Sequence, residues 1–193
     1  MATLDTARHL IPSPAGVLTW LGRPVASTER RLFEHILRAG RPLPIDMHGL
    51  AAALSLPTAT VARTLFALNR HQSLSVLETP AEARQSWAET GLAGLSDELA
   101  ALATPGQTLL LSGADGFCIA RAGWTRYEAE VMAARRPEDH RHHQGEIMPL
   151  YFGSRCFYLS ANARIDLKNP ALLRLAHRLL TGCGPLAEEG ASC

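Results

Sequence analysis

The residue types best suited to contacting nucleic acid gather between positions 58 and 70. Val61, Leu65 and Leu68 are spaced at i, i+4 and i+7, which predicts a helix that buries these three side chains. Arginine can form two hydrogen bonds with the edge of guanine, and threonine can bind phosphate or contact the methyl group of thymine. The residues expected to contact DNA lie outside that buried seam or at its edge and are Thr58, Thr60, Arg63, Thr64 and Arg70.

The elements around this helix follow a familiar order. A helix is expected from Thr28 to Ala39, where Gly40 ends it, and a second from Met47 to Leu54, opened by an Asp46 cap. The third helix starts near Pro57, and Ser73 to Glu78 alternates as a short strand does. Three helices followed by a strand, with a short turn between the last two helices, predict a winged helix-turn-helix.

This segment resembles the DNA-binding module of IclR-type regulators, over about a quarter to a third of the chain. The resemblance implies binding to double-stranded DNA through the third helix. Two features favour protein contact instead: an outward-facing Phe66, and a segment from Ser75 to Pro80 without the basic residues that a DNA-binding wing normally has. The matching positions are Leu50, Ala51, Leu54, Leu56, Pro57, Thr60, Val61, Arg63, Leu65 and Leu68.

The C-terminal part is expected to alternate helices with two hairpins. The Asp115-Gly116 pair predicts the first hairpin turn, and Thr125 with Glu128 forms a capping box that opens a helix. The expected helices are 81–89, 92–103, 125–136 and a last one from Asn169-Pro170 to Gly182; the expected strands are 108–112, 117–120, 148–152 and 156–160.

The segment from Leu111 to Gly123, together with Ala129 to Ala134, resembles roadblock/dynein-light-chain domains, and the resemblance covers about 100 residues. That resemblance implies a profilin-like sheet with helices on its faces, and a homodimer. One departure is the short charged stretch between the middle helix and the second hairpin, where such domains run longer. A small GAF-like sensor domain has similar local patterns and stays open as the alternative.

Other chemistry finds less support in the sequence. Asp139, His140, His142, His143 and Glu146 contain metal-ligating groups, but their spacing matches no structural zinc pattern, and a solvated loop is expected there. The four cysteines form no Cys-x-x-Cys pair, and Cys118 and Cys156 are expected to behave as small buried apolar residues. The chain has no Gly-x-Ser-x-Gly, P-loop or dinucleotide motif. We therefore expect neither an enzyme, nor a bound metal, nor a cofactor.

Length and composition limit the class of protein and the number of domains. The chain has 193 residues, of which 47% are hydrophobic and 19% charged, and this excludes general disorder and allows one or two domains. No run reaches about 18 continuous apolar residues and the first residues lack an apolar signal region, so a cytoplasmic protein with no membrane span is expected. Residues 20–80 hold seven arginines against four acidic residues, whereas residues 81–193 hold eleven basic against thirteen acidic residues.

These observations predict an α+β protein with four parts. Residues 1–24 are expected to be an N-terminal arm or short packing segment, 25–80 the winged helix-turn-helix, 81–183 a small roadblock-like α/β domain, and 184–193 a flexible tail. The expected function is a DNA-binding transcriptional regulator that dimerises or senses a signal through its C-terminal domain. The alternative is a homodimeric scaffold or adaptor that binds a protein partner, which the roadblock resemblance implies to be a small GTPase.

Overall fold

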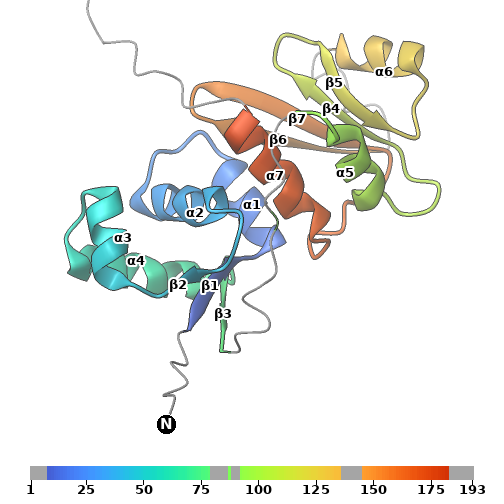
Figure 1. The fold of residues 1–193 in the computed structure, drawn as a ribbon. Helices are drawn as coiled ribbons and strands as arrows, with labels where there is room; N and C mark the ends of the chain where they lie inside the picture. The colour runs from blue at the N-terminus through green and yellow to red at the C-terminus, as the bar shows by residue number, and fades with distance from the viewer. Residues whose placement is uncertain (1–7, 79–86, 88–91, 136–144, 183–193) are drawn as a thin grey trace, which may run out of the picture.

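The computed structural model describes residues 8–78, 87, 92–135 and 145–182, which form helices and two antiparallel sheets (Figure 1). The chain is thus of the α+β class, as predicted. In chain order the elements are β1 (His9–Pro12), α1 (Pro14–Leu21), α2 (Thr28–Arg38), β2 (Leu43–Pro44), α3 (Met47–Leu54), α4 (Thr58–Arg70), β3 (Leu74–Leu77), α5 (Leu95–Leu102), β4 (Leu109–Gly113), β5 (Cys118–Ala122), α6 (Arg126–Ala133), β6 (Glu146–Phe152), β7 (Arg155–Ala161) and α7 (Ala171–Gly182).

The first sheet has the order β2-β1-β3, and its central strand comes from the N-terminal segment. The segment predicted to be an arm or a short packing segment supplies strand β1 of this sheet and then helix α1, which buries Val17 and Leu21 completely. Ser13 opens α1 by accepting a hydrogen bond from the Gly16 amide, and Pro14 occupies the first turn. The prolines that suggested irregular chain therefore mark the end of a strand and the start of a helix.

The second sheet has the order β5-β4-β7-β6 and is covered by helices on both faces. Alternate residues of β6 and β7 point into the main core, where α5 and α7 lie against the sheet. On the opposite face, α6 covers Leu110 of β4 with Ala129 and Ala133. Gly116 has a φ of 82° in the predicted turn between β4 and β5.

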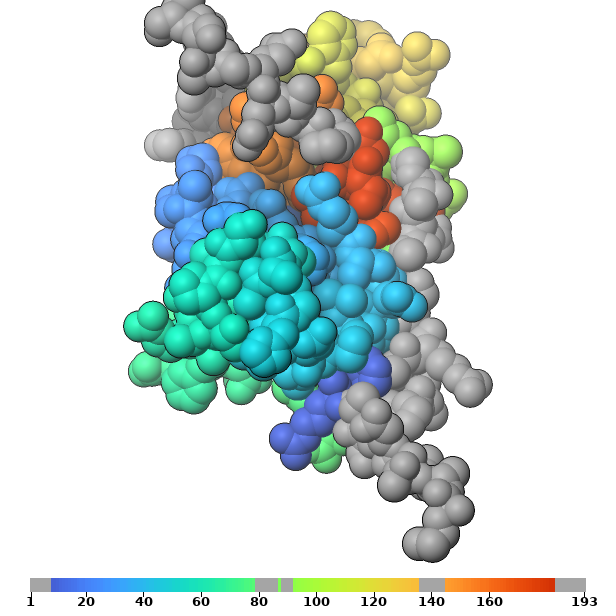
Figure 2. Space-filling view, turned by 60° about the vertical axis from the view of Figure 1, so that its left-hand side comes forward, coloured from blue at the N-terminus to red at the C-terminus, as the bar shows by residue number. Residues whose placement is uncertain are grey.

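One hydrophobic core runs through both halves of the chain. Helix α7 is buried along most of its length, and it contacts α1 and α2 on one side and α5 on the other, so the N-terminal helices lie directly beside it (Figures 1 and 2). Buried Trp87 donates its backbone N–H to the Gly40 carbonyl over 2.8 Å and its ring N–H to the Leu37 carbonyl over 3.0 Å. The boundary predicted between residues 80 and 81 thus separates two sheets that share a core.

Most predicted elements that fall on described residues are present, with shifts of a few residues at their ends. Helix α3 has the predicted bounds, and Gly40 follows α2 with a φ of 67°. The capping box of Thr125 and Glu128 is formed, but its helix ends at Ala133, three residues before the predicted end. Except for Trp87, the helix expected at 81–89 lies outside the described residues, as does the tail at 184–193.

Within the described part of the chain, no single helix is long and apolar enough to cross a membrane, although α3 and α4 taken together would pass by length and composition across a 102° bend.

Candidate nucleic-acid interface

Helices α3 and α4 are joined by a tight turn and differ in direction by 102°. Asp46 opens α3 by accepting hydrogen bonds from the amides of His48 and Gly49, each over 3.0 Å. Ser55 follows α3 in the left-handed region with a φ of 53°, and Pro57 directly precedes α4. A crossing of roughly 90–120° over a turn of three or four residues is the geometry of a helix-turn-helix pair.

The inner face of α4 buries Val61, Thr64 and Leu68, and the helix packs against α2 and α3. This corrects one predicted contact residue, because the Thr64 side chain is only 4% exposed and cannot reach a molecule in solvent. The seam predicted from Val61, Leu65 and Leu68 is otherwise present, with Leu65 partly buried. Thr64 lies three residues after Val61, close enough on the helix surface to share its buried side.

The outer face of α4 carries the other four predicted contact residues. Arg63 and Arg70 are exposed, whereas Thr58 and Thr60 are half-buried in the first turn. That turn has no acidic residue and no side-chain cap on its amides, so the positive end of the helix dipole is not neutralised within α4. Phe66 lies on the same helix and is 70% exposed. The face thus combines cations, hydroxyl groups and one large aromatic ring.

Charged groups near α3 have mixed signs. Asp46 places a carboxylate at the start of α3, while Arg31 of α2 donates a 2.9 Å hydrogen bond to the Leu54 carbonyl at its end. Further along α2, burial and, to a lesser extent, the Arg38 cation lower the pKa of His35. A neutral His35 adds no positive charge to this surface.

The strand predicted from Ser73 to Glu78 is present as β3, and its described neighbour in the sheet is β1. Strand β3 pairs with β1 along its length, so among the described residues the strand next to β3 comes from the N-terminal segment. At the far end of this pair, Arg8 and Glu78 form an exposed ion pair with a nitrogen–oxygen distance of 3.4 Å. No local signal predicts Arg8 at this place, because the pairing of β1 with β3 joins residues more than sixty positions apart.

The structure also bears on the other chemistry considered. Residues 139–143 lie outside the described residues, and the Glu146 carboxylate accepts a 2.8 Å hydrogen bond from the Ile165 amide. Among the residues that are described, no group of three histidine, cysteine or acidic side chains is placed to hold a metal ion. Burial raises the pKa of the Cys118 thiol, with Arg121 opposing and Glu130 adding to the shift. A raised pKa is the opposite of what activates a nucleophilic cysteine.

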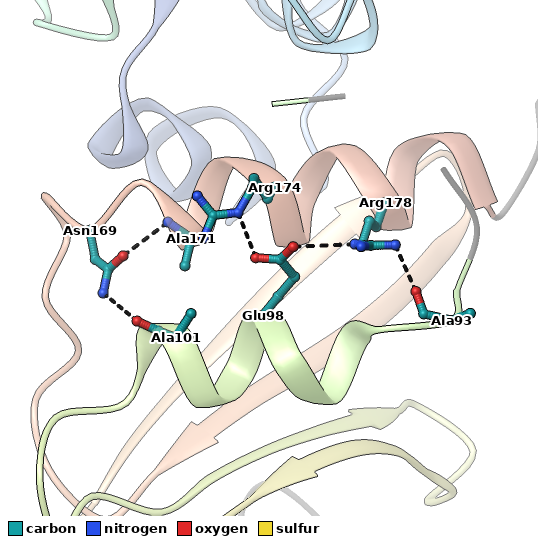
Figure 3. Close-up of polar contacts among 7 residues, drawn as sticks. All are labelled: Ala93, Glu98, Ala101, Asn169, Ala171, Arg174 and Arg178. Atoms are coloured by element: carbon teal, nitrogen blue, oxygen red, sulfur yellow. Dashed lines mark hydrogen bonds and ion pairs between the residues drawn. The ribbon is translucent and has the colours of Figure 1, made fainter. Parts of the chain in front are cut away.

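A polar cluster between α5 and α7 was not anticipated from the sequence (Figure 3). The buried Glu98 carboxylate accepts hydrogen bonds from Arg174 over 2.7 Å and from Arg178 over 3.4 Å. Arg178 also donates to the Ala93 carbonyl over 2.6 Å. The Asn169 side-chain amide donates to the Ala101 carbonyl, and its oxygen accepts a hydrogen bond from the Ala171 amide in the first turn of α7. These groups satisfy one another and fix α5 on α7, so we assign the cluster a structural role.

No family model, no curated protein and no solved structure matches this chain significantly.

Proposed function

We propose that this protein is a DNA-binding transcriptional regulator that contacts duplex DNA with α4. One observation carries the proposal: α4 follows α3 across a tight 102° turn and leaves Arg63 and Arg70 exposed, with Thr58 and Thr60 half-exposed in its first turn. In a helix-turn-helix, the early residues of the second helix meet base edges or phosphates. Figure 1 places α3 and α4 at one end of the molecule, where a duplex can approach them. We expect a protein with this function to be cytoplasmic.

The N-terminal half also has a suitable charge. Residues 8–78 hold eight arginines and four acidic residues, of which Glu34 and Glu78 pair with arginines. Phosphate contacts by arginine release counterions, so binding should weaken as salt rises. We therefore keep the winged helix-turn-helix interpretation for this half, in which β1 is the described strand that pairs with β3.

For the C-terminal half, the proposal is a roadblock-like module that dimerises or senses a signal, with a GAF-like module as the alternative. Its support is the antiparallel sheet β5-β4-β7-β6 with α5 and α7 on one face and α6 on the other. A homodimer would present two α4 helices to two half-sites, which compensates for the few cations on each helix. Sedimentation velocity would measure whether the chain is a dimer.

The test is a titration of the protein into fluorescent duplex DNA at about 50 and about 200 mM salt. We expect binding that weakens steeply between the two conditions. At the same salt concentration, Arg63→Ala should weaken DNA binding by about 1–3 kcal/mol relative to the wild type if Arg63 contacts guanine. The matched control is Arg155→Ala, which removes an exposed arginine from the second sheet. No binding at the lower salt, or equal effects of the two variants, would refute the proposal for α4.

A second candidate function is supported by Phe66, which is 70% exposed in the middle of α4. A large exposed aromatic side chain suits a protein interface, so α4 would then dock a protein partner of a homodimeric scaffold. Affinity purification distinguishes this candidate. The control is Phe117→Ser, which alters an equally exposed ring in the turn before β5. A stoichiometric partner that is lost with Phe66→Ser but retained with Phe117→Ser would favour the scaffold, provided that duplex DNA does not bind.

A further inference from the structure

A hollow of about 440 Å³ lies between the end of α1, the connection to α2, and the residue that follows α4. Its walls come from Leu18 and Trp20 of α1, Val25 of the connection, Glu29 of α2 and His71 after α4, with Arg23 at the rim. Volumes of about 300–1,000 Å³ are typical of small-molecule sites. The hollow is separate from the outer face of α4 and from the cluster around Glu98.

The floor of the hollow is apolar. The Trp20 ring N–H is already engaged by the Ser73 hydroxyl over 2.8 Å, so the indole offers the hollow its carbon surface and no free donor. The His71 ring stands edge-on to the indole, with ring centres 6.1 Å apart. Val25 is 59% exposed, and an occupant would remove this aliphatic surface from water.

The rim carries one charge of each sign. Within the described part of the chain, neither the Arg23 guanidinium nor the Glu29 carboxylate takes part in an ion pair or a side-chain hydrogen bond. The backbone around both groups is nevertheless held in place. The Arg23 carbonyl accepts a 2.6 Å hydrogen bond from Arg30, and Glu29 lies in the first turn of α2, which Ser27 caps.

We propose that this hollow binds a zwitterionic α-amino acid with a large apolar side chain. Arg23 pairs with the ligand carboxylate, Glu29 pairs with its ammonium group, and the side chain lies on Trp20, Leu18 and Val25. A ligand with a single charge would leave one rim group unpaired in the complex, which favours a zwitterion. The binding does not depend on the proposed DNA contact, although an occupant would touch His71 directly after α4.

Isothermal titration calorimetry of the full chain with L-phenylalanine tests the inference. We expect one saturable site with a Kd of about 1 mM or tighter. Arg23→Gln and Glu29→Gln should each weaken binding about tenfold, because each removes one charge-assisted pairing. Phenylacetate and phenethylamine, which each lack one of the two charges, should bind about tenfold more weakly. Arg155→Gln, which removes an exposed arginine far along the chain, is the control and should bind as the wild type does.

Three results would overturn the proposal: no saturable heat with L-phenylalanine at about 10 mM, binding that neither rim variant weakens, or binding of either single-charge analogue that is as tight as that of L-phenylalanine. Circular dichroism would verify that each variant is folded. If a rim variant fails to fold, Val25→Asp replaces it, since Val25 is exposed and a carboxylate there would spoil the apolar floor. Undiminished binding by folded Val25→Asp would also refute the site.

Discussion

The Glu98 carboxylate of α5 contributes to the packing of α5 against α7. It is buried, and two arginines of α7 converge on it (Figure 3). Replacing it by alanine would leave those cations without their shared anion in a mostly buried place. We expect Glu98→Ala to lower the free energy of unfolding by about 3 kcal/mol, measured by urea denaturation.

The control for this prediction is an ion pair of similar length on the surface. Arg126 and Glu130 approach to 2.8 Å on α6, and both are largely exposed to solvent. Glu130→Ala should change the free energy of unfolding by less than about 0.5 kcal/mol, because water screens the pair. Equal losses for Glu98→Ala and Glu130→Ala would show that burial of the first cluster contributes nothing.

His35 predicts a dependence of stability on pH. Burial, and secondarily Arg38, lower its pKa in the folded state below the ordinary value of 6.5, so the unfolded chain binds the proton more tightly. The stabilisation by neutral His35 is therefore complete above pH 6.5 and is lost as the pH falls through the lowered folded-state value.

Urea denaturation of the wild type and His35→Gln at about pH 7.5 and about pH 5.5 tests this sign. The wild type should lose more stability between the two conditions than the variant. His48→Gln, which removes an exposed histidine from α3, controls for the loss of one imidazole. The same loss in the wild type and His35→Gln would contradict the prediction.

At the scale of elements, local signals predicted the helices well. The bounds of α3 follow from the Asp46 cap and the break at Ser55 to Pro57, and α7 starts after Asn169, whose side chain accepts from the Ala171 amide. The two hairpins follow from the turn at Gly116 and the turn after Phe152. These features depend on a few neighbouring residues, so the sequence shows them directly.

Features that depend on distant residues were missed or misplaced. Strand β1 has four residues, and only its pairing with β2 and β3 makes it a strand. Thr64 could not be assigned to the buried side of α4 without knowing how widely α2 and α3 cover that helix. The connection between α1 and α2 brings Arg23 and Glu29 to one hollow. No short sequence motif predicts this connection.

Helix α1 provides a steric test of how closely the N-terminal elements fit together. A Cβ on Gly16 would lie 2.7 Å from the Phe33 ring and 2.8 Å from the Ser73 carbonyl oxygen, and the second of these is backbone. We expect Gly16→Ala to destabilise the fold by about 1–3 kcal/mol despite the better helix propensity of alanine. Thr19→Ala, at an exposed position of the same helix, should cost less than about 0.5 kcal/mol. A Gly16→Ala variant as stable as the wild type would mean that α1 can move away from Phe33 and Ser73 freely.

At the scale of the whole molecule, the two halves are joined by a core and by one buried arginine. Arg30 of α2 donates to Glu34 on its own helix, to the Arg23 carbonyl, and to the Tyr151 carbonyl on β6. The last bond links the half that contains α4 to the second sheet. Because α7 also packs against α1, α2 and α5, neither half keeps a complete core without the other.

This arrangement predicts that both halves unfold together. Trp20 and Trp87 report on the N-terminal helices and Trp124 on the second sheet, so single-tryptophan variants can follow each half in urea. Their transitions should coincide, and Arg30→Ala should lower both midpoints equally, by about 2–3 kcal/mol in free energy of unfolding, because it leaves Glu34 and the Tyr151 carbonyl without their donor. Two separate transitions, with only the first moved by Arg30→Ala, would instead show two independent domains. A single transition would mean that a ligand bound to the second sheet can stabilise α4 through the shared core.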